Sequence, residues 1–495
     1  MPVNSTHPNY QTMSARWVRC RDAYEGEDNV KTRGETYLPR LSSHTSATDP
    51  KYVAYKSRAM FYGATGRTVE GLCGMATRKP YTIDAPEVVM NFENDITGTG
   101  ITLRDFIKTV ARDVLVTGRF GILVDRTEDG SRPYFAGYAA ENILNWRFDS
   151  SGKLALLVVK EVRDEIDPAD KYVVARVSYY REFMLDELGF VVAKVWREEK
   201  GATGVTQFKQ VGGDILPTFR GQRIAEIPFV FVNSEGSGAD IVKPPLLDMV
   251  NVNFSHYRNS ADLEHGRHFV ALPTPWFTGV SAGNLEDGSG NNAQITIGSE
   301  TAILLPDPQS SAGMLEFTGQ GLSALENALK SKEDLMAILG ARLLENTKRA
   351  AETAETTRLN KSGDNSMLAS IVNSVSDAIA RALRLMAQWE GNDPEAVMFE
   401  MPRDMLDTTL DATQISALVQ AMQAGGISLD TFLYNMKLGE ILPDDVDVED
   451  EKSRIENAKP KSTGTPMNLD DDPDAGQLDE DGKPIKKPDD KTATK

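Results

Sequence analysis

One pentapeptide in the sequence has the spacing of a hydrolase nucleophile. Gly279-Val280-Ser281-Ala282-Gly283 fits G-x-S-x-G, in which a serine on a sharp turn between a strand and a helix attacks a carbonyl carbon. Residues 284–292 are rich in Gly, Asn and Asp and cannot supply the helix that must follow. The base of such an enzyme comes after the serine, whereas all five histidines precede it: His7, His44, His256, His265 and His268. A β-turn is the favoured interpretation, and no catalytic residue is assigned.

Three other groups lack part of the pattern that their chemistry needs. His265-Gly266-Arg267-His268 has no H-E-x-x-H spacing and no second ligand cluster, so no metal is assigned. The stretch 63–68 resembles a phosphate loop but has no lysine. Asp125 ends an expected strand, where a nuclease could place a carboxylate, but the turn at 127–130 favours a hairpin residue. Neither cysteine lies in a C-x-x-C pattern, so free thiols are expected, and no motif indicates a cofactor.

Residues 348–366 contain a local excess of basic side chains, Lys348, Arg349, Arg358 and Lys361. A solvated loop is one interpretation, and a loop that touches DNA phosphates transiently is the other. The whole chain has a net charge of −19, which argues against tight nucleic-acid binding over most of its surface. An acidic surface with a few basic residues would let DNA pass without holding it.

Ser281 and the basic residues of 348–366 lie in a central segment, 244–391. Its pattern predicts three helices, at 244–265, 322–347 and 367–389. A Gly- and Pro-rich stretch, 269–321, separates the first two and predicts short strands at 295–297 and 301–305. The first helix has a narrow apolar stripe and polar residues at most other positions. That pattern is typical of a helix that bridges solvent or packs against copies of itself. Ser323 and Glu326 predict a capping box at the start of the second helix.

The rest of the chain predicts a mixture of helices and strands, which indicates an α+β protein. Thr102 and Asp105 suggest a helix start, and Gly118 a helix end. Helices are predicted at 12–30, 51–74, 102–117, 411–424 and 428–438. Strands are predicted at 120–125, 154–159, 172–180, 190–196, 228–232 and 397–401.

Composition bounds the environment of the protein. Of its 495 residues, 40% are hydrophobic and 26% charged, which is ordinary for a soluble globular protein. No apolar run reaches the length of about 18 residues that spans a membrane, and the first residues are polar. We therefore expect a soluble, cytoplasmic product with no membrane partner. The tail 443–495 holds sixteen acidic, nine basic and no aromatic residues, so we predict that it is disordered.

Several stretches, taken in order, resemble the portal proteins of tailed bacteriophages, within a subgroup catalogued as a phage domain of unknown function. They are YLPRL (37–41), YKSRAMFYGATGRTVEGLCGMATRKP (55–80), GRFGILVD (118–125), IPFVFVN (227–233), PPLLDMVNVNFSHYRNSADLE (244–264) and MAILGARLL (336–344). The resemblance covers roughly residues 12–400. No single motif is catalytic, but their order is specific in combination.

The resemblance implies a portal fold with a β-rich wing, a helical stem, a small α/β clip, a long helix behind a tunnel loop and a helical crown. The implied regions are wing 1–243, stem helix one 244–266, clip 267–321, stem helix two 322–347, tunnel loop 348–366, long wing helix and strand 367–403, crown 404–442 and acidic tail 443–495.

Portal proteins form a ring, usually a dodecamer, at one capsid vertex, through which DNA is packaged and ejected. The resemblance therefore implies a non-enzymatic virion protein that is found in the host cytoplasm during assembly. Implied partners are the terminase large subunit, a head-completion or adaptor protein, the major capsid and scaffold proteins, and double-stranded DNA held without sequence specificity. Lys348, Arg349, Arg358 and Lys361 would face that DNA. Two alternatives stay open: another head–tail connector or capsid-associated protein, and an enzyme that uses Ser281 or Asp125.

Overall fold

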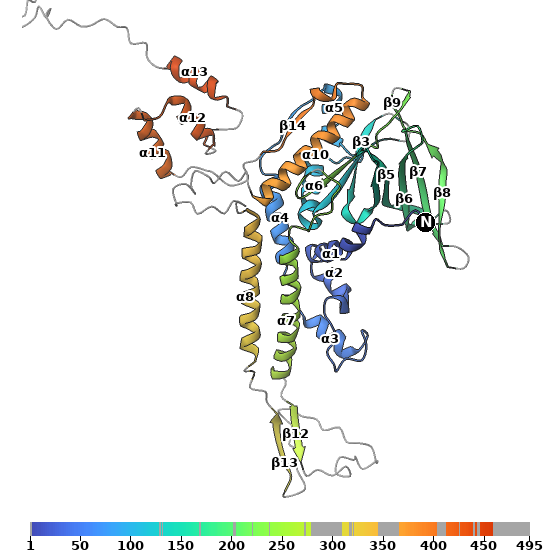
Figure 1. Ribbon diagram of the computed structural model, residues 1–495. Helices are drawn as coiled ribbons and strands as arrows, with labels where there is room; N and C mark the ends of the chain where they lie inside the picture. Colours follow the sequence, from blue (N-terminus) through green and yellow to red (C-terminus); the bar gives the residue numbers. More distant parts are fainter. Residues whose placement is uncertain are drawn as a thin grey trace, which may run out of the picture. The chain divides into compact units, whose positions relative to one another are not determined.

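The chain divides into two compact units, Met1–Leu406 and Asp407–Lys495, in the computed structural model. The structure describes residues 2–127, 130, 132–167, 170–200, 204–219, 221–236, 238–271, 274–278, 309–315, 319, 321–344, 366–402, 412–424, 426–438, 441–442 and 446–458. Helices and strands are mixed in the first unit (Figure 1), so the predicted α+β class is confirmed.

Helix α6 (Leu103–Thr117) forms where the sequence carries both a start and a stop signal. The Oγ1 atom of Thr102 accepts a hydrogen bond from the Asp105 amide at 3.1 Å and donates one to the Asp105 carboxylate at 2.8 Å. Gly118 ends the helix with a φ of 75°, which glycine adopts without the clash that a Cβ would cause. The helix predicted at 102–117 is confirmed, and the chain passes directly into β2 (Arg119–Arg126).

Strand β2 is the centre of a three-stranded antiparallel sheet, in the order β11-β2-β3. Its neighbours are β3 (Pro133–Ala139) and β11 (Phe229–Asn233). Helix α10 (Met367–Trp389) contacts α6 and all three strands, and its buried side is apolar except for Ser374 and Ser376. The helix predicted at 367–389 and the strands predicted at 120–125 and 228–232 are confirmed.

A second sheet has five antiparallel strands in chain order, from β4 to β8. Their bounds are β4 (Ile143–Phe148), β5 (Leu154–Asp167), β6 (Asp170–Leu185), β7 (Val191–Lys200) and β8 (Thr206–Ile215). The sequence predicted part of each of β5, β6 and β7, leaving out the buried Phe183 of β6, and missed β4 and β8. The predicted strand at 154–159 ends too early, because the second half of β5 is polar and lacks an apolar pattern. That half is supported by cross-strand ion pairs such as Glu165 with Arg197 at 2.6 Å.

The N-terminal part is helical, with α1 (Pro8–Glu25), α2 (Glu27–Thr32), α3 (Pro50–Arg58) and α4 (Ala64–Ala76). The single helix predicted at 51–74 is wrong, because the chain leaves the helical path between α3 and α4. There the amide of Met60 donates to Ser260 Oγ at 3.1 Å, and Phe61 is buried against the aromatic ring of Tyr257. The helix predicted at 12–30 is also divided, at Gly26, whose φ is 99°.

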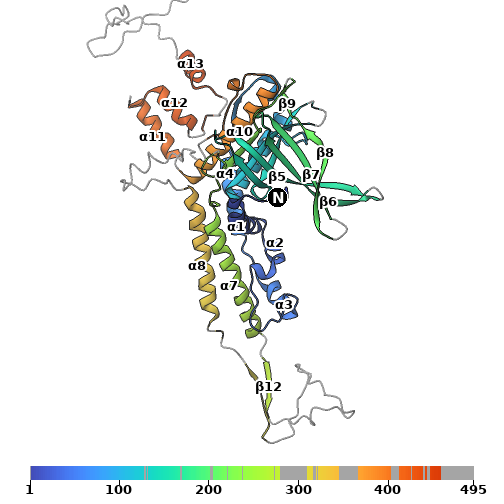
Figure 2. The ribbon, with the colours of Figure 1, turned by 45° about the vertical axis from the view of Figure 1, so that its right-hand side comes forward.

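Two long helices, α7 (Leu247–Ala271) and α8 (Leu322–Ala341), lie side by side and project away from the sheets (Figures 1 and 2). Between them in the chain, β12 (Thr274–Thr278) pairs antiparallel with β13 (Ser311–Leu315). The strands predicted at 295–297 and 301–305 lie outside the described residues. The predicted capping box is wrong: α8 begins at Leu322, its N-cap Gly321 has no side chain, and Glu326 binds Arg267 instead. The helix ends in a 3₁₀ turn, η5 (Arg342–Leu344).

Shorter elements complete the first unit, and one pairing among them closes it. Strand β1 (Thr82–Asp84) pairs antiparallel with β14 (Met398–Glu400), which brings the chain after α10 back to the N-terminal part. The others are η1 (Gly34–Thr36), α5 (Glu87–Met90), η2 (Glu93–Asp95), η3 (Ala140–Asn142), β9 (Thr218–Phe219), β10 (Gln222–Arg223) and η7 (Pro394–Ala396).

The second unit contains α11 (Ala412–Gln423), α12 (Leu429–Leu438) and α13 (Val448–Ala458). The first two confirm the helices predicted at 411–424 and 428–438. The third corrects the prediction that the whole tail is disordered. Acidic residues fill its first turn, where their negative charge interacts favourably with the positive end of the helix dipole. Within the described residues, no helix has the length and apolar character needed to cross a bilayer.

Candidate functional site

The helix pair α7–α8 is the element around which a functional site is built, and cross-helix contacts fix its register. Lys332 Nζ donates to the Ser255 carbonyl at 3.1 Å, and His256 Nε2 lies 3.1 Å from Glu333 Oε1. Nearer the other end, Arg267 Nη2 donates to Glu326 Oε1 at 2.8 Å. As the α7 number rises from 256 to 267, the α8 number falls from 333 to 326, so the two helices are antiparallel.

The polar side chains of α7 mostly bind other parts of the same chain. Asn253 is fully buried and donates to Thr65 Oγ1 on α4 at 2.9 Å, and Asp262 accepts from the Tyr55 hydroxyl on α3 at 2.6 Å. Asn251 accepts from Arg19 on α1 at 3.0 Å. The expectation of a solvent-bridging helix is therefore wrong for these three side chains, which tie α7 to α1, α3 and α4. Packing on copies of the chain stays a prediction.

Helix α8 is covered along one side only. Met336 and Gly340 are its only buried residues, and all of α8 lies within the described part of the chain. A Cβ on Gly340 would lie 3.2 Å from Thr68 Cγ2, so glycine permits a close approach to α4 at this level. On the outer side, Leu335 and Ile338 are 41% and 50% exposed. A helix of one chain that leaves neighbouring aliphatic side chains in water has a surface suited to a further contact.

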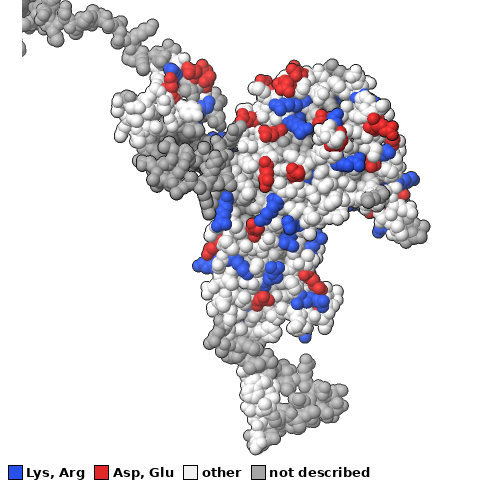
Figure 3. All heavy atoms as spheres, in the orientation of Figure 1, with Lys and Arg blue, Asp and Glu red and all other residues white. Residues whose placement is uncertain are grey.

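Charge on this face of the molecule is mixed. Figure 3 shows both signs of charge interspersed over the helix pair and the helices beside it, so the acidic excess of the chain is not gathered there. Between the two helices, burial lowers the pKa of His256, while the hydrogen bond and the charge of Glu333 act in the opposite direction. Burial also lowers the pKa of Lys332, and the charge of Arg258 adds to that effect. The seam between α7 and α8 therefore favours neutral side chains.

The structure leaves the predicted DNA-facing residues untested. Lys348, Arg349, Arg358 and Lys361 all lie outside the described residues, as does Ser281.

Asp125 lies within the described residues and belongs to an ion-pair network between the two sheets. Its Oδ2 atom is 2.6 Å from Arg181 Nη2 and accepts from the Tyr134 hydroxyl at 3.2 Å. Arg181 also lies 3.5 Å from Glu161, which accepts from the Tyr138 hydroxyl at 2.6 Å. Arg181 and Tyr134 therefore hold the carboxylate of Asp125 in place. This structural role could not be seen from the spacing of residues in the sequence.

His265 and His268, near the end of α7, contact α3 and the nearby Phe269. His265 packs edge-on against Tyr55 and Phe269, and His268 Nε2 lies 3.1 Å from Arg58 Nη2. Although both histidines lie near a helix end, they are partly covered by α3. Among the residues that the structure describes, no cluster of His, Cys, Asp and Glu could hold a metal ion.

Burial raises the pKa of both cysteine thiols, to about 12 for Cys20.

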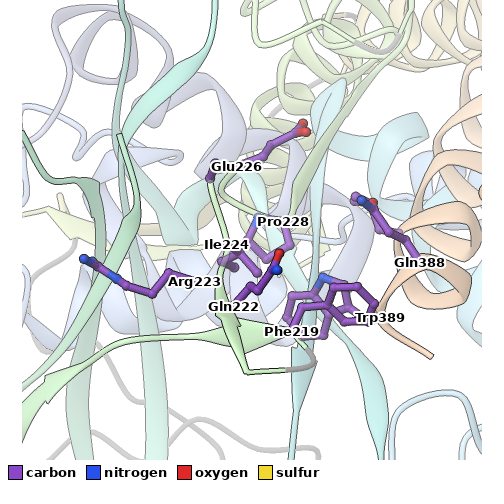
Figure 4. Close-up of a pocket in the computed structure, with 10 residues that line it drawn as sticks. Phe219, Gln222, Arg223, Ile224, Glu226, Pro228, Gln388 and Trp389 are labelled. Atoms are coloured by element: carbon purple, nitrogen blue, oxygen red, sulfur yellow. The ribbon is translucent and has the colours of Figure 1, made fainter. Parts of the chain in front are cut away.

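One pocket lies between the β9–β10 hairpin and the end of α10 (Figure 4). Its volume is about 180 Å³, below the range of about 300–1,000 Å³ typical of sites for small ligands. Arg223 points away from the other lining side chains, toward Asp186, with which it forms an ion pair at 2.7 Å. Glu226 at its edge lies 3.4 Å from Arg381. Because the pocket is small and its two charged side chains, Arg223 and Glu226, are held in ion pairs, we assign no ligand to it.

A larger groove was not predicted from the sequence. It lies between α1, η1 and α7 and has a volume of about 520 Å³. Ala15, Val18 and Phe254 provide apolar lining, and arginines lie among them. The groove brings together residues more than 230 positions apart in the chain, so no local pattern could have revealed it.

Comparisons with known proteins add the following. A family model described as "Domain of unknown function (DUF4055)" matches residues 245–390, which is less than a third of the chain and runs from the start of α7 to the end of α10. No curated protein matches.

Similar solved structures are distant. One, "Neck of empty GTA particle computed with C6 symmetry", has 11% identity and a TM-score of 0.36 and covers 74% of this chain and 86% of that chain. "Virion of native gene transfer agent (GTA) particle" has 12% identity and a TM-score of 0.34, covering 80% and 93%. "Neck of native GTA particle computed with C12 symmetry" has 11% identity and a TM-score of 0.36, covering 81% and 95%.

Proposed function

We propose that this chain is the subunit of a phage-type portal: a ring at one capsid vertex through which double-stranded DNA is packaged and ejected. The observation that carries the proposal is the helix pair α7–α8. One side of the pair is anchored to α1, α3 and α4, whereas the other side leaves Leu335 and Ile338 exposed on α8. A pair with two different sides is suited to stand between identical neighbours, and contacts of this head-to-tail kind close into a ring when the rotation closes.

The order of elements supports the same proposal. A long helix, a Gly- and Pro-rich connection, an antiparallel long helix, a polar segment and a third long helix follow one another between residues 247 and 389. That order matches the stem, clip, second stem helix, tunnel loop and long wing helix implied by the sequence resemblance. In this proposal the clip, residues 267–321, contacts the terminase during packaging and an adaptor afterwards, and capsid and scaffold proteins surround the ring. Lys348, Arg349, Arg358 and Lys361 face the DNA.

The net charge of −19 suits a conduit rather than a DNA-binding site. Phosphate is repelled by an acidic bore, which keeps the duplex centred, and a few basic residues in each subunit give contacts that salt screens. No chemistry by the chain itself is needed. We accordingly propose that the protein is not an enzyme. Neither Ser281→Ala nor Asp125→Asn should therefore remove a hydrolytic activity that packaging needs.

The experiment is electron microscopy of the purified full chain in negative stain, at ionic strength near that of the assembled particle. The proposal expects rings with an axial hole wide enough for a DNA duplex. Particles that stay monomeric at every concentration and salt would contradict it. Rings that have a hole too narrow for a duplex would favour the alternative of another head–tail connector.

A further inference from the structure

The α1–η1–α7 groove and the exposed patch of α8 lie on opposite sides of the helix pair. In an α-helix each residue advances by about 100°, so two residues that are two positions apart point about 200° apart. Phe254 lines the groove, and His256 faces Glu333 on α8. By the same step, Leu335 points away from the side on which Glu333 meets α7. The pair therefore separates a concave surface on α7 from a convex apolar patch on α8.

The two surfaces also lie at the same level along the pair. His256 and Glu333 are opposite each other, at 3.1 Å. Phe254 lies two residues toward the start of α7, and Leu335 lies two residues toward the end of α8. Because the helices are antiparallel, both steps move by about 3 Å toward the same end of the pair. A rotation about an axis parallel to the helices carries the groove of one subunit onto the patch of the next without a shift.

The side chains on the two surfaces are complementary in character. The groove offers the apolar side chains of Ala15, Val18 and Phe254, and the patch offers Leu335 and Ile338, which are 41% and 50% exposed. Burial of such groups from water is favourable.

The charges on the two surfaces are complementary as well. Three arginines lie in the groove, Arg19, Arg33 and Arg258. Asp22 holds Arg33 at 2.9 Å, whereas Arg19 binds the neutral amide of Asn251 at 3.0 Å. Across the described part of the chain, neither Arg19 nor Arg258 has a carboxylate partner. Among the same residues, Asp334, beside Leu335 on the outer side of α8, has no basic partner. Exposed basic residues also lie on either side of the patch: Lys330 one turn nearer the start of α8, and Arg342 one turn after Ile338.

We propose that, in the ring, Leu335 and Ile338 of one subunit enter the α1–η1–α7 groove of the next subunit, with Asp334 facing Arg19 and Arg258. This inference rests on the proposed ring and names the surface that closes it. The two surfaces differ, so the contact is head-to-tail, and a subunit with either surface blocked ends the ring.

Charge reversal tests the pairing. Asp334→Arg and Arg258→Glu should each weaken association about tenfold or more, because like charges then meet at the interface, and the double variant should recover ring assembly. Arg176→Glu is the matched control, since Arg176 is 82% exposed on β6, outside both surfaces. The readout is the fraction of ring in sedimentation velocity. Single variants that assemble like the wild type, or a double variant that is weaker than both singles, would overturn the pairing.

Disulfide trapping gives a second test that does not depend on weakening the ring. Ala15→Cys with Ile338→Cys places one thiol in the groove and one on the patch, on opposite sides of the pair, so a bond forms between subunits. The native Cys20 and Cys73 are buried. After oxidation with diamide, the double variant should give a ladder of covalent multimers and each single variant should not. Rings without a ladder would overturn this interface and leave the proposed function standing, whereas a wild-type chain without rings would overturn both.

Discussion

The imidazole of His256 on α7 lies 3.1 Å from the carboxylate of Glu333 on α8, and this contact fixes how the two helices of the projecting pair meet. The histidine side chain is only 6% exposed, whereas that of Glu333 is 42% exposed. The Nδ1 atom of His256 faces no hydrogen-bonding partner among the described residues. A second proton on the ring would therefore be buried without an acceptor.

Burial of His256 should make the helix pair sensitive to acid. Burial lowers the pKa of His256 below its ordinary value of 6.5, despite the opposing effect of Glu333. The unfolded chain therefore binds a proton that the folded chain resists, and stability is lost as pH falls below 6.5 through the folded pKa. We expect the melting temperature of the wild type to fall more between pH 7.5 and about pH 5 than that of His256→Gln. Equal losses in the two proteins would contradict this account.

The network around Arg181 should be a stabilising element of the two sheets. Removing its guanidinium leaves Asp125 and Glu161 partly buried without their shared partner, so Arg181→Gln should lower the free energy of unfolding by about 3 kcal/mol. Arg176→Gln, on the same strand, breaks an exposed pair with Asp164 at 3.5 Å and should change stability little. Urea denaturation of both variants makes the comparison, and similar effects at the two sites would show that the network is not specific.

Gly121 should tolerate no side chain. An added Cβ would lie 2.8 Å from Phe229 Cε1 and 2.9 Å from Ile143 Cδ1, so rigid neighbours in the sheet core would have to move. We expect Gly121→Ala to cost about 1–3 kcal/mol of stability. Gly213→Ala is the control, because nothing lies within 4 Å of the position that its Cβ would take. Thermal unfolding measures both, and an unchanged melting temperature for Gly121→Ala would count against the packing described for β2.

Neutralising the four basic residues of segment 348–366 should separate assembly from DNA handling. A variant in which Lys348, Arg349, Arg358 and Lys361 are all replaced by glutamine should form rings normally but package or retain less DNA. The matched control replaces four lysines of the acidic tail: Lys483, Lys486, Lys487 and Lys491. Packaging is measured as DNA protected from nuclease in assembled particles. Protection equal to that of the wild type would remove the role proposed for this segment.

Local signals predicted those parts of the fold whose ends are marked by neighbouring residues. Thr102, Asp105 and Gly118 defined α6, because both caps lie within the helix's own sequence. The 3–4 spacing of apolar residues likewise defined α10. The tail helix α13 was missed because net charge was taken as the deciding feature, although its acidic first turn favours a helix.

Features that depend on distant contacts could not be predicted. The break between α3 and α4 depends on Ser260, which accepts from Met60 two hundred residues away. The polar side chains of α7 looked solvent-facing because their partners, among them Thr65 and Tyr55, come from other helices. The α1–η1–α7 groove exists only after three separate elements have packed together.

The central claim is that identical subunits stand side by side around an open axis, and native mass spectrometry of the full-length chain tests it most directly. The account predicts one dominant closed assembly whose mass is a whole-number multiple of the 54.4 kDa subunit, with the dodecamer expected. A spectrum that contains only the 54.4 kDa monomer, in conditions where the chain is folded, would contradict it.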